Sequence, residues 1–162
     1  MAKFSHSVLF LAAALCFVSA VSCEDFKVHG MVYCDTCLAG FETRVTEYMS
    51  GANVTLECRD REGGHLTYTG NGVTDKTGGY TILVDGDHEE EVCQVVLTES
   101  PRSDCTRKIP GRSVGRVAIT ANNGIQEPVR FVNSLGFLKD EPLEVCGEVI
   151  AELGLTPEDI MV

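Results

Sequence analysis

Apolar and polar residues alternate with a period of two along much of this chain, which is the pattern of strands with one buried face. The clearest case is the segment 54–59, where polar residues separate Val54, Leu56 and Cys58. Similar apolar or β-branched runs occur at 26–33, 80–84, 92–97, 114–120 and 129–132. Segments rich in turn-forming residues separate them at 61–64, 70–72, 76–79, 85–87 and 122–124. The pattern predicts an all-β sandwich or small barrel of about seven antiparallel strands. Parallel crossovers are not expected, because no connection has room for a helix with its loops.

One helix is predicted near the C-terminus. Pro142 can start it, Gly154 can end it, and apolar residues recur between them with helical spacing. This apolar face consists of Leu143, Cys146, Val149, Ile150 and Leu153. A further helix of one turn at most is predicted from Thr156, because a proline and two acids follow this N-cap residue.

The first 23 residues have the features of a secretory signal peptide: a charge at Lys3, an apolar core at 8–18 and small residues after it. Eight cysteines occur in the chain, and removing residues 1–23 removes two of them. The even set that remains predicts a disulfide framework in an oxidising compartment. Cleavage after Ala20 would retain Cys23 and leave an odd number, so we favour cleavage after Cys23, although 18–20 also fits a cleavage site. Residues 24–162 are expected to form a single secreted, extracellular domain.

The mature chain is strongly acidic. The net charge of the whole chain is −11, and loss of Lys3 with the signal peptide makes it −12. This balance argues against a nucleic-acid partner and against docking on an anionic membrane. It favours a neutral or basic partner, unless it serves only solubility. No later segment approaches the roughly 18 apolar residues of a spanning helix, so no membrane insertion is expected.

Cys34 and Cys37 form a CxxC pair, which is open to three interpretations: a zinc half-site, a redox dithiol or two structural half-cystines. A zinc site needs two more ligands at similar spacing, and the sequence offers none. A redox dithiol begins a helix in a βαβ setting, whereas this pair follows a strand-like run. We therefore favour structural half-cystines, each bonded to a distant cysteine.

Other candidate chemistry is sparse. His29, His65 and His88 are far apart in the sequence and are predicted to be solvated or satisfied surface residues. The acidic run 85–91 could supply oxygen ligands to calcium, but it lacks the EF-hand pattern, and a solvated, self-repelling loop is favoured. Without a GxSxG or HExxH motif, we assign no catalytic, metal or cofactor residue. Asn53, in Asn-Val-Thr, is predicted to be glycosylated if the chain is exported.

The segment 30–37, Gly-Met-Val-Tyr-Cys-Asp-Thr-Cys, resembles the signature of the olive pollen major allergen family, the Ole e I and extensin-like proteins of plants. The order of the cysteines and the segments 74–80, 122–125 and 133–137 resemble the family as well, so the likeness covers 26–146. Two positions depart from the signature. Leu38 stands where a basic residue is usual, and His29 stands where Glu, Gln or Thr is usual.

The resemblance implies a seven-stranded sandwich or barrel, immunoglobulin-like or transthyretin-like, with three disulfides and no catalytic residues. It also implies the pairing of the cysteines, which the sequence alone leaves among 15 connectivities. The implied pairs are Cys34–Cys105, Cys37–Cys146 and Cys58–Cys93.

The resemblance further implies a secreted plant protein located in the apoplast or cell wall. It would bind a cell-wall component or a receptor ectodomain in pollen hydration, germination or tube growth. We expect recognition to lie in loops at 61–64, 85–91 and 122–125, because loops on a rigid scaffold commonly carry it. A second hypothesis is a protease inhibitor with Arg102 or Lys108 as its specificity residue. A third is a wall-acting hydrolase with paired carboxylates in a cleft.

Overall fold

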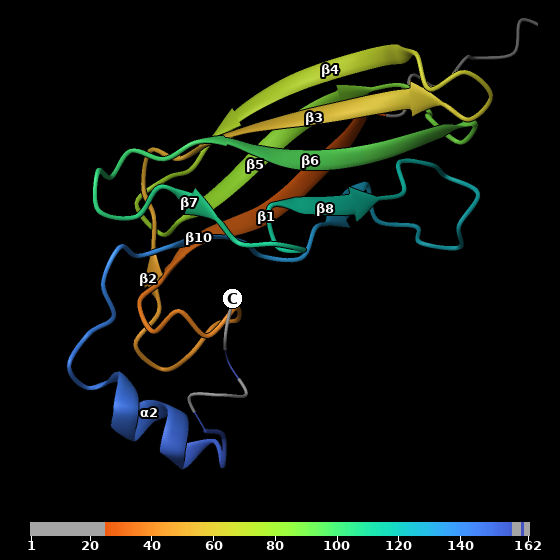
Figure 1. The fold of residues 1–162 in the computed structure, drawn as a ribbon. Helices are drawn as coiled ribbons and strands as arrows, with labels where there is room; N and C mark the ends of the chain where they lie inside the picture. The colour runs from red at the N-terminus through yellow and green to blue at the C-terminus, as the bar shows by residue number, and fades with distance from the viewer. Residues whose placement is uncertain (1–24, 157–159, 161–162) are drawn as a thin grey trace, which may run out of the picture.

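A computed structural model describes residues 25–156 and Ile160. The predicted signal peptide and most of the turn expected after Thr156 lie outside these residues. Over the described part the chain forms ten strands and one helix (Figure 1). The elements are β1 (Asp25–Asp35), β2 (Glu47–Tyr48), β3 (Asn53–Asp60), β4 (Leu66–Val73), β5 (Gly79–Asp85), β6 (Glu91–Glu99), β7 (Arg107–Lys108), β8 (Val114–Val117), β9 (Val129–Phe131), β10 (Leu135–Leu138) and α2 (Cys146–Glu152).

Two sheets pack face to face, so the predicted all-β sandwich is confirmed. One sheet is antiparallel, with the order β4-β3-β6-β8. The other is built around β1, whose first half pairs with β5 and β9 and whose second half pairs with β2 and β10, with β7 beyond β10. Val54, Leu56 and Cys58 point into the core between the sheets, as their alternation predicts.

The expectation that parallel pairing would be absent is wrong. β1 pairs in parallel with both β9 and β10. The prediction considered only crossovers that contain a helix. Here the chain leaves β1, forms the strands of the opposite sheet, and returns much later to lie beside β1.

The predicted turn at 70–72 is also wrong, because these residues lie inside β4. A Cβ on Gly70 would lie 3.0 Å from Ile82 of β5, and one on Gly72 would lie 2.9 Å from the same side chain. The glycines therefore leave room for the Ile82 side chain against β4 rather than reverse the chain.

Helix α2 begins at Cys146, later than the Pro142 that the sequence suggested. Leu143 instead donates its backbone N–H to the Thr36 carbonyl (3.0 Å) before the helix starts. Gly154 ends the helix as predicted: its φ is +71°, and the N–H groups of Gly154 and Leu155 bond to the Ala151 and Ile150 carbonyls. Of the predicted apolar face, Leu153 is 53% exposed.

Helix α2 and its neighbours form a small cluster of their own. Val149 and Ile150 pack with Cys37, Ala39 and Cys146, apart from the core between the sheets. Within residues 25–156, no helix has the length and apolar character that crossing a bilayer requires.

Three disulfides join the elements, in the pairing that the resemblance implies. Cys58–Cys93 links directly opposed residues of β3 and β6 and closes a separation of 35 residues. Cys34–Cys105 and Cys37–Cys146 span 71 and 109 residues and tie the end of β1 to later parts of the chain.

Candidate functional site

Three loops that lie far apart in the sequence meet at one end of the sandwich (Figure 1). Arg61, in the β3–β4 turn, donates from Nη2 to the carbonyl of Glu89 (2.7 Å), which precedes β6. Asn122, in the β8–β9 loop, donates from Nδ2 to the Glu89 carboxylate (2.5 Å). These bonds connect the three loops into one surface, which we call the loop end (residues 60–65, 85–91 and 118–128). It contains all three segments that the sequence nominated for recognition.

Asp87 adds further links between two of these loops. Its Oδ2 accepts hydrogen bonds from the Ala121 N–H (2.9 Å) and the Thr120 hydroxyl (3.1 Å), and its Oδ1 accepts one from the Glu89 N–H (2.8 Å). The Ala121 bond contributes most to holding the pKa of Asp87 below its usual value. The acidic run is an exposed connection between β5 and β6, as the sequence predicts, and the bonds of Asp87 link it to the β8–β9 loop.

The surface of the loop end contains an open hollow of about 890 Å³. It is lined by Asp60, Arg61, Glu62, Gly63, His65 and Glu90. Asp60 is already engaged, because its Oδ1 accepts the N–H groups of Gly63 (2.5 Å) and Gly64 (2.8 Å). Glu62, His65 and Glu90 are exposed. The arrangement offers polar groups to a partner, but it does not enclose a carboxylate pair as a hydrolase requires.

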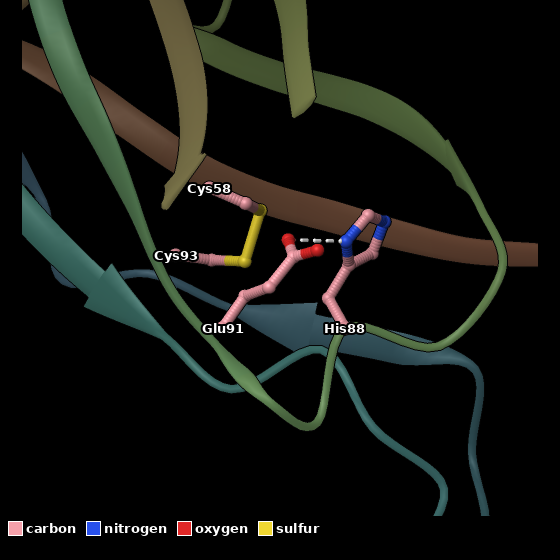
Figure 2. A group of neighbouring side chains, drawn as sticks. All are labelled: Cys58, His88, Glu91 and Cys93. Atoms are coloured by element: carbon pink, nitrogen blue, oxygen red, sulfur yellow. Dashed lines mark hydrogen bonds and ion pairs between the residues drawn. A yellow bond between two sulfur atoms is a disulfide. The ribbon is translucent and has the colours of Figure 1, made fainter. Parts of the chain in front are cut away.

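His88 belongs to the second loop of the loop end and is held by Glu91 (Figure 2). The distance from His88 Nδ1 to Glu91 Oε2 is 2.7 Å, and the imidazole packs against the Tyr68 ring at a centroid distance of 4.9 Å. The side chain is only 10% exposed, and its Nε2 is buried without a hydrogen-bond partner. The prediction of a solvated or satisfied surface histidine is therefore wrong for His88.

His88 and Glu91 also adjoin Cys58 and Cys93, and the potential ligand atoms of these four residues lie within 4.8 Å of one another. Within the described residues this is the only such group, and it includes a single carboxylate of the acidic run, so the calcium alternative gains no support. Both sulfur atoms are in a disulfide and are not thiolate ligands (Figure 2). The group forms a polar border to the disulfide.

Arg130 fixes the β8–β9 loop from within. The residue is only 4% exposed, and its Nη2 donates to the Thr120 carbonyl (2.6 Å) and the Ile125 carbonyl (3.4 Å). Its Nη1 donates to the Glu127 carbonyl, and its guanidinium lies 4.7 Å from the Phe26 ring centre. One buried cation thus holds the third loop of the loop end to the start of β1.

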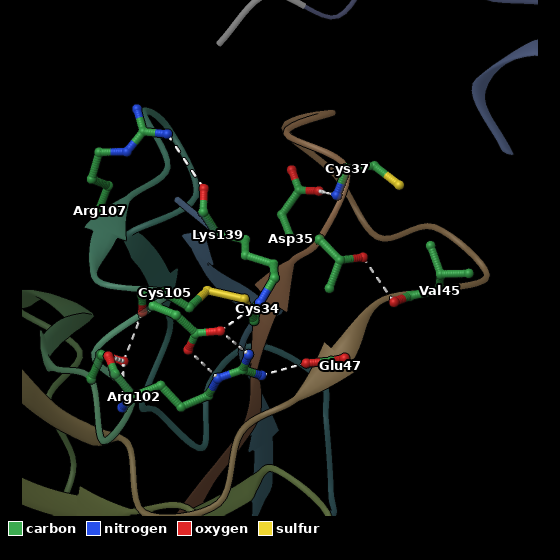
Figure 3. Close-up of a disulfide and its surroundings, with 12 residues drawn as sticks. Cys34, Asp35, Cys37, Val45, Glu47, Arg102, Cys105, Arg107 and Lys139 are labelled. Carbon is green, nitrogen blue, oxygen red and sulfur yellow. Dashed lines mark hydrogen bonds and ion pairs between the residues drawn. A yellow bond between two sulfur atoms is a disulfide. The ribbon is translucent and has the colours of Figure 1, made fainter. Parts of the chain in front are cut away.

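The Cys34–Cys37 motif lies away from the loop end and has a structural role (Figure 3). Each cysteine is bonded to a distant partner, and the intervening Asp35 is fully buried. Asp35 accepts the N–H groups of Cys37 (3.0 Å) and Gly40 (2.7 Å), while the Thr36 hydroxyl donates to a carbonyl of the next loop. The motif therefore anchors a turn instead of presenting reactive thiols.

Arg102 does not meet the needs of an inhibitor loop. Its guanidinium bonds Asp104 (2.9 and 2.7 Å) and Glu47, and Asp104 also binds Lys139 (Figure 3). The bonds from Arg102, and then that from Lys139, hold the pKa of Asp104 well below its usual range. Lys108 is exposed, but it lies in strand β7 and Ile109 after it is buried.

Asn53, the predicted glycosylation residue, starts β3 at the opposite end of that strand from the loop end. Its Nδ2 donates to Glu99 (3.3 Å), and its side chain lies on the outer face, because the next residue, Val54, points into the core. Leu38, one departure from the family signature, packs with Tyr33, Ile109 and Leu138. An apolar contact therefore stands where the family usually has a basic side chain.

Sequence reasoning did not identify Arg130 or the His88–Glu91 pair. The i, i+3 spacing of His88 and Glu91 was a usable signal, because this spacing lets the side chains meet across a turn. Arg130 gave no local signal, since its carbonyl partners are brought to it only by the fold.

Comparison with known proteins agrees with the motif. A family model described as "Pollen protein Ole e 1 like" matches residues 24–154. The "Olee1-like protein" of Betula pendula is 48% identical over 164 residues, covering 97% of this chain and 99% of that protein. "Pollen allergen Che a 1" of Chenopodium album is 42% identical over 163 residues, covering 96% of each.

A solved structure agrees as well. The crystal structure of the major plantain pollen allergen Pla l 1 superposes with a TM-score of 0.66 at 32% sequence identity. The match covers 74% of this chain and 97% of that one. Two of these three names describe pollen allergens, and none describes an enzyme.

Proposed function

The chain belongs to the family of pollen proteins like Ole e 1, and from that premise we propose that it is a secreted, non-enzymatic binding protein of pollen. Its partner is a receptor ectodomain or a cell-wall component met during hydration, germination or tube growth. The loop end is the recognition surface.

One observation carries the proposal: three loops nominated separately for recognition are joined by hydrogen bonds of Arg61, Asp87 and Asn122 into a single surface. Because these bonds and Arg130 hold the loops in place, little conformational entropy would be lost on binding. The exposed Glu62, His65 and Glu90 supply polar contacts around the hollow.

Two further features support the assignment. The hollow is open and holds no enclosed pair of carboxylates, which favours binding over hydrolysis. A glycan on Asn53 would leave the surface free, because Asn53 and the loop end lie at opposite ends of β3.

The proposal is tested by cross-linking the mature protein in intact pollinated tissue, identifying the partner, and measuring its affinity for purified variants. The test variant is E62A/H65A/E90A. The control H29A/E141A/E144A removes the same kinds of side chain outside the loop end. We expect about a tenfold or greater loss of affinity in the test variant alone, since polar groups of a recognition surface lose charge-assisted contacts. Equal affinity in the two variants would reject the loop end as the binding surface.

A further inference from the structure

A local concentration of positive charge stands out in this acidic chain. Residues 105–126 contain four basic residues and no acid, although the mature chain carries a net charge of −12. The four are Arg107, Lys108, Arg112 and Arg116, and all are exposed. Three of them, Arg107, Lys108 and Arg112, flank the turn between β7 and β8. We call these three the basic ridge.

The backbone of the basic ridge is fixed. Ile109 between its members is buried, and the Arg112 N–H bonds the Ile109 carbonyl (3.0 Å) to close a turn. Pro110 and Gly111, whose φ is +73°, occupy the central positions that a type II turn requires. Gly136 of β10 holds both sides of this turn. The Ile109 N–H donates to the Gly136 carbonyl (3.1 Å), and the Gly136 N–H donates to the Arg112 carbonyl (2.9 Å).

The charges of the ridge are not neutralised within the described part of the protein. The ion pairs among the described residues involve other basic residues: Arg44, Arg59, His88, Arg102 and Lys139. The adjacent network balances itself, because Arg102 and Lys139 are matched by Asp104 and Glu47. Arg107 makes only a long bond from Nη2 to the Lys139 carbonyl (3.4 Å). Three exposed cationic groups therefore lie within residues 107–112 on a backbone held by hydrogen bonds.

We propose that the basic ridge binds an acidic polysaccharide, a chain of uronate sugars whose carboxylates repeat along its length. Guanidinium groups match carboxylates in shape and can bond them through two N–H groups at once. The ridge is exposed to solvent, so one carboxylate would bind weakly. A polymer can engage all three cations together, and its binding is strengthened by effective concentration. That the polyanion is a wall polysaccharide rests on the proposed extracellular function, whereas the charge complementarity does not.

The test measures binding of the mature protein to polygalacturonate in low salt by biolayer interferometry. The variant R107Q/K108Q/R112Q removes the ridge, and K27Q/R59Q/K76Q removes the same number of charges elsewhere. We expect the affinity for polygalacturonate to fall about tenfold or more in the ridge variant and to be retained in the control. Because an exposed site of this kind is electrostatic, the affinity of the wild type should also fall as salt is raised. Neutral galactan and monomeric galacturonate should not bind.

Three results would overturn the inference: no binding of the wild type, equal loss in both triple variants, or equal binding to anionic lipid vesicles. The last would indicate a general anion surface. The loop-end variants used to test the proposed function keep the ridge intact. Their polygalacturonate binding should match the wild type, so failure of either idea is recognised separately.

Discussion

Removing the Cys37–Cys146 disulfide should release the C-terminal helix while the two sheets stay folded. The perturbation is the double substitution C37A/C146A. Helix α2 has seven residues, and it contacts a cluster of its own, separate from the core between the sheets. The disulfide is the covalent link between this cluster and the end of β1.

The magnitudes favour release. Burying Val149 and Ile150 contributes about 3–6 kcal/mol together. Ordering seven backbone residues opposes folding by about 7–14 kcal/mol. Hydrogen bonds in the helix offset part of this, yet helices shorter than about 12 residues are marginal in water. The Arg44–Glu152 pair is exposed and adds little. The disulfide therefore keeps α2 docked by confining it near its cluster.

Hydrogen exchange followed by mass spectrometry measures this directly. In C37A/C146A, peptides covering 146–155 should exchange as unstructured chain, while those from β3 and β6 remain protected. The matched control is C58A/C93A. Chain-entropy estimates give about 4–5 kcal/mol of stabilisation for either bond, so the two variants should lose similar amounts of stability and differ only in which part of the protein opens. The control should lower the global unfolding midpoint and leave α2 as protected as the strands. Wild-type protection of α2 in C37A/C146A would refute the reasoning.

Three further predictions concern the buried Arg130, two glycines and the tyrosines. Arg130→Met should lower the free energy of unfolding by about 2 kcal/mol in urea titrations, because buried carbonyls lose their donor; an unchanged midpoint would contradict this. Gly30→Ala should lower the free energy of unfolding by about 1–3 kcal/mol, because the added Cβ would lie 2.3 Å from the Tyr80 hydroxyl oxygen. Gly147→Ala should raise the free energy of unfolding by about 0.5–1 kcal/mol, because Gly147 lies in α2 and its added Cβ would meet open space. Melting curves that reverse this order would disprove the packing argument. Burial raises the pKa of Tyr33 to about 12, and the pKa values of the other three tyrosines are raised too, so phenolate absorbance should appear above pH 10. The stabilisation from neutral Tyr33 is present below pH 10 and lost as pH approaches 12; normal titration of all four in the folded protein would be the contrary result.

The sequence predicted those elements whose own residues carry the signal. The alternation at 54–58 places one face of β3 in the core, and Gly154 ends α2 because only its backbone permits that turn at low cost. The two-residue strands β2 and β7 were missed, because their pairing depends on β1 and β10 and not on a local pattern.

The candidate site was predicted in outline only. The three loops were nominated from turn chemistry, but nothing in the sequence showed that they meet. Their contact depends on the packing of the two sheets and on the buried Arg130, whose carbonyl partners come from distant backbone. The burial of His88 likewise depends on Tyr68, which β4 supplies.

The position of β1 between β5 and β9, and then between β2 and β10, determines the order in which the chain can mature. This strand is synthesised before all of its partners, and two of them, β9 and β10, are synthesised near the end. Cys34 and Cys37 cannot form their native disulfides until Cys105 and Cys146 have been synthesised. Cys58 and Cys93 are synthesised in the interval. Oxidation that outpaces synthesis would therefore trap non-native pairs among the early cysteines, and the native pairing would then require disulfide isomerisation.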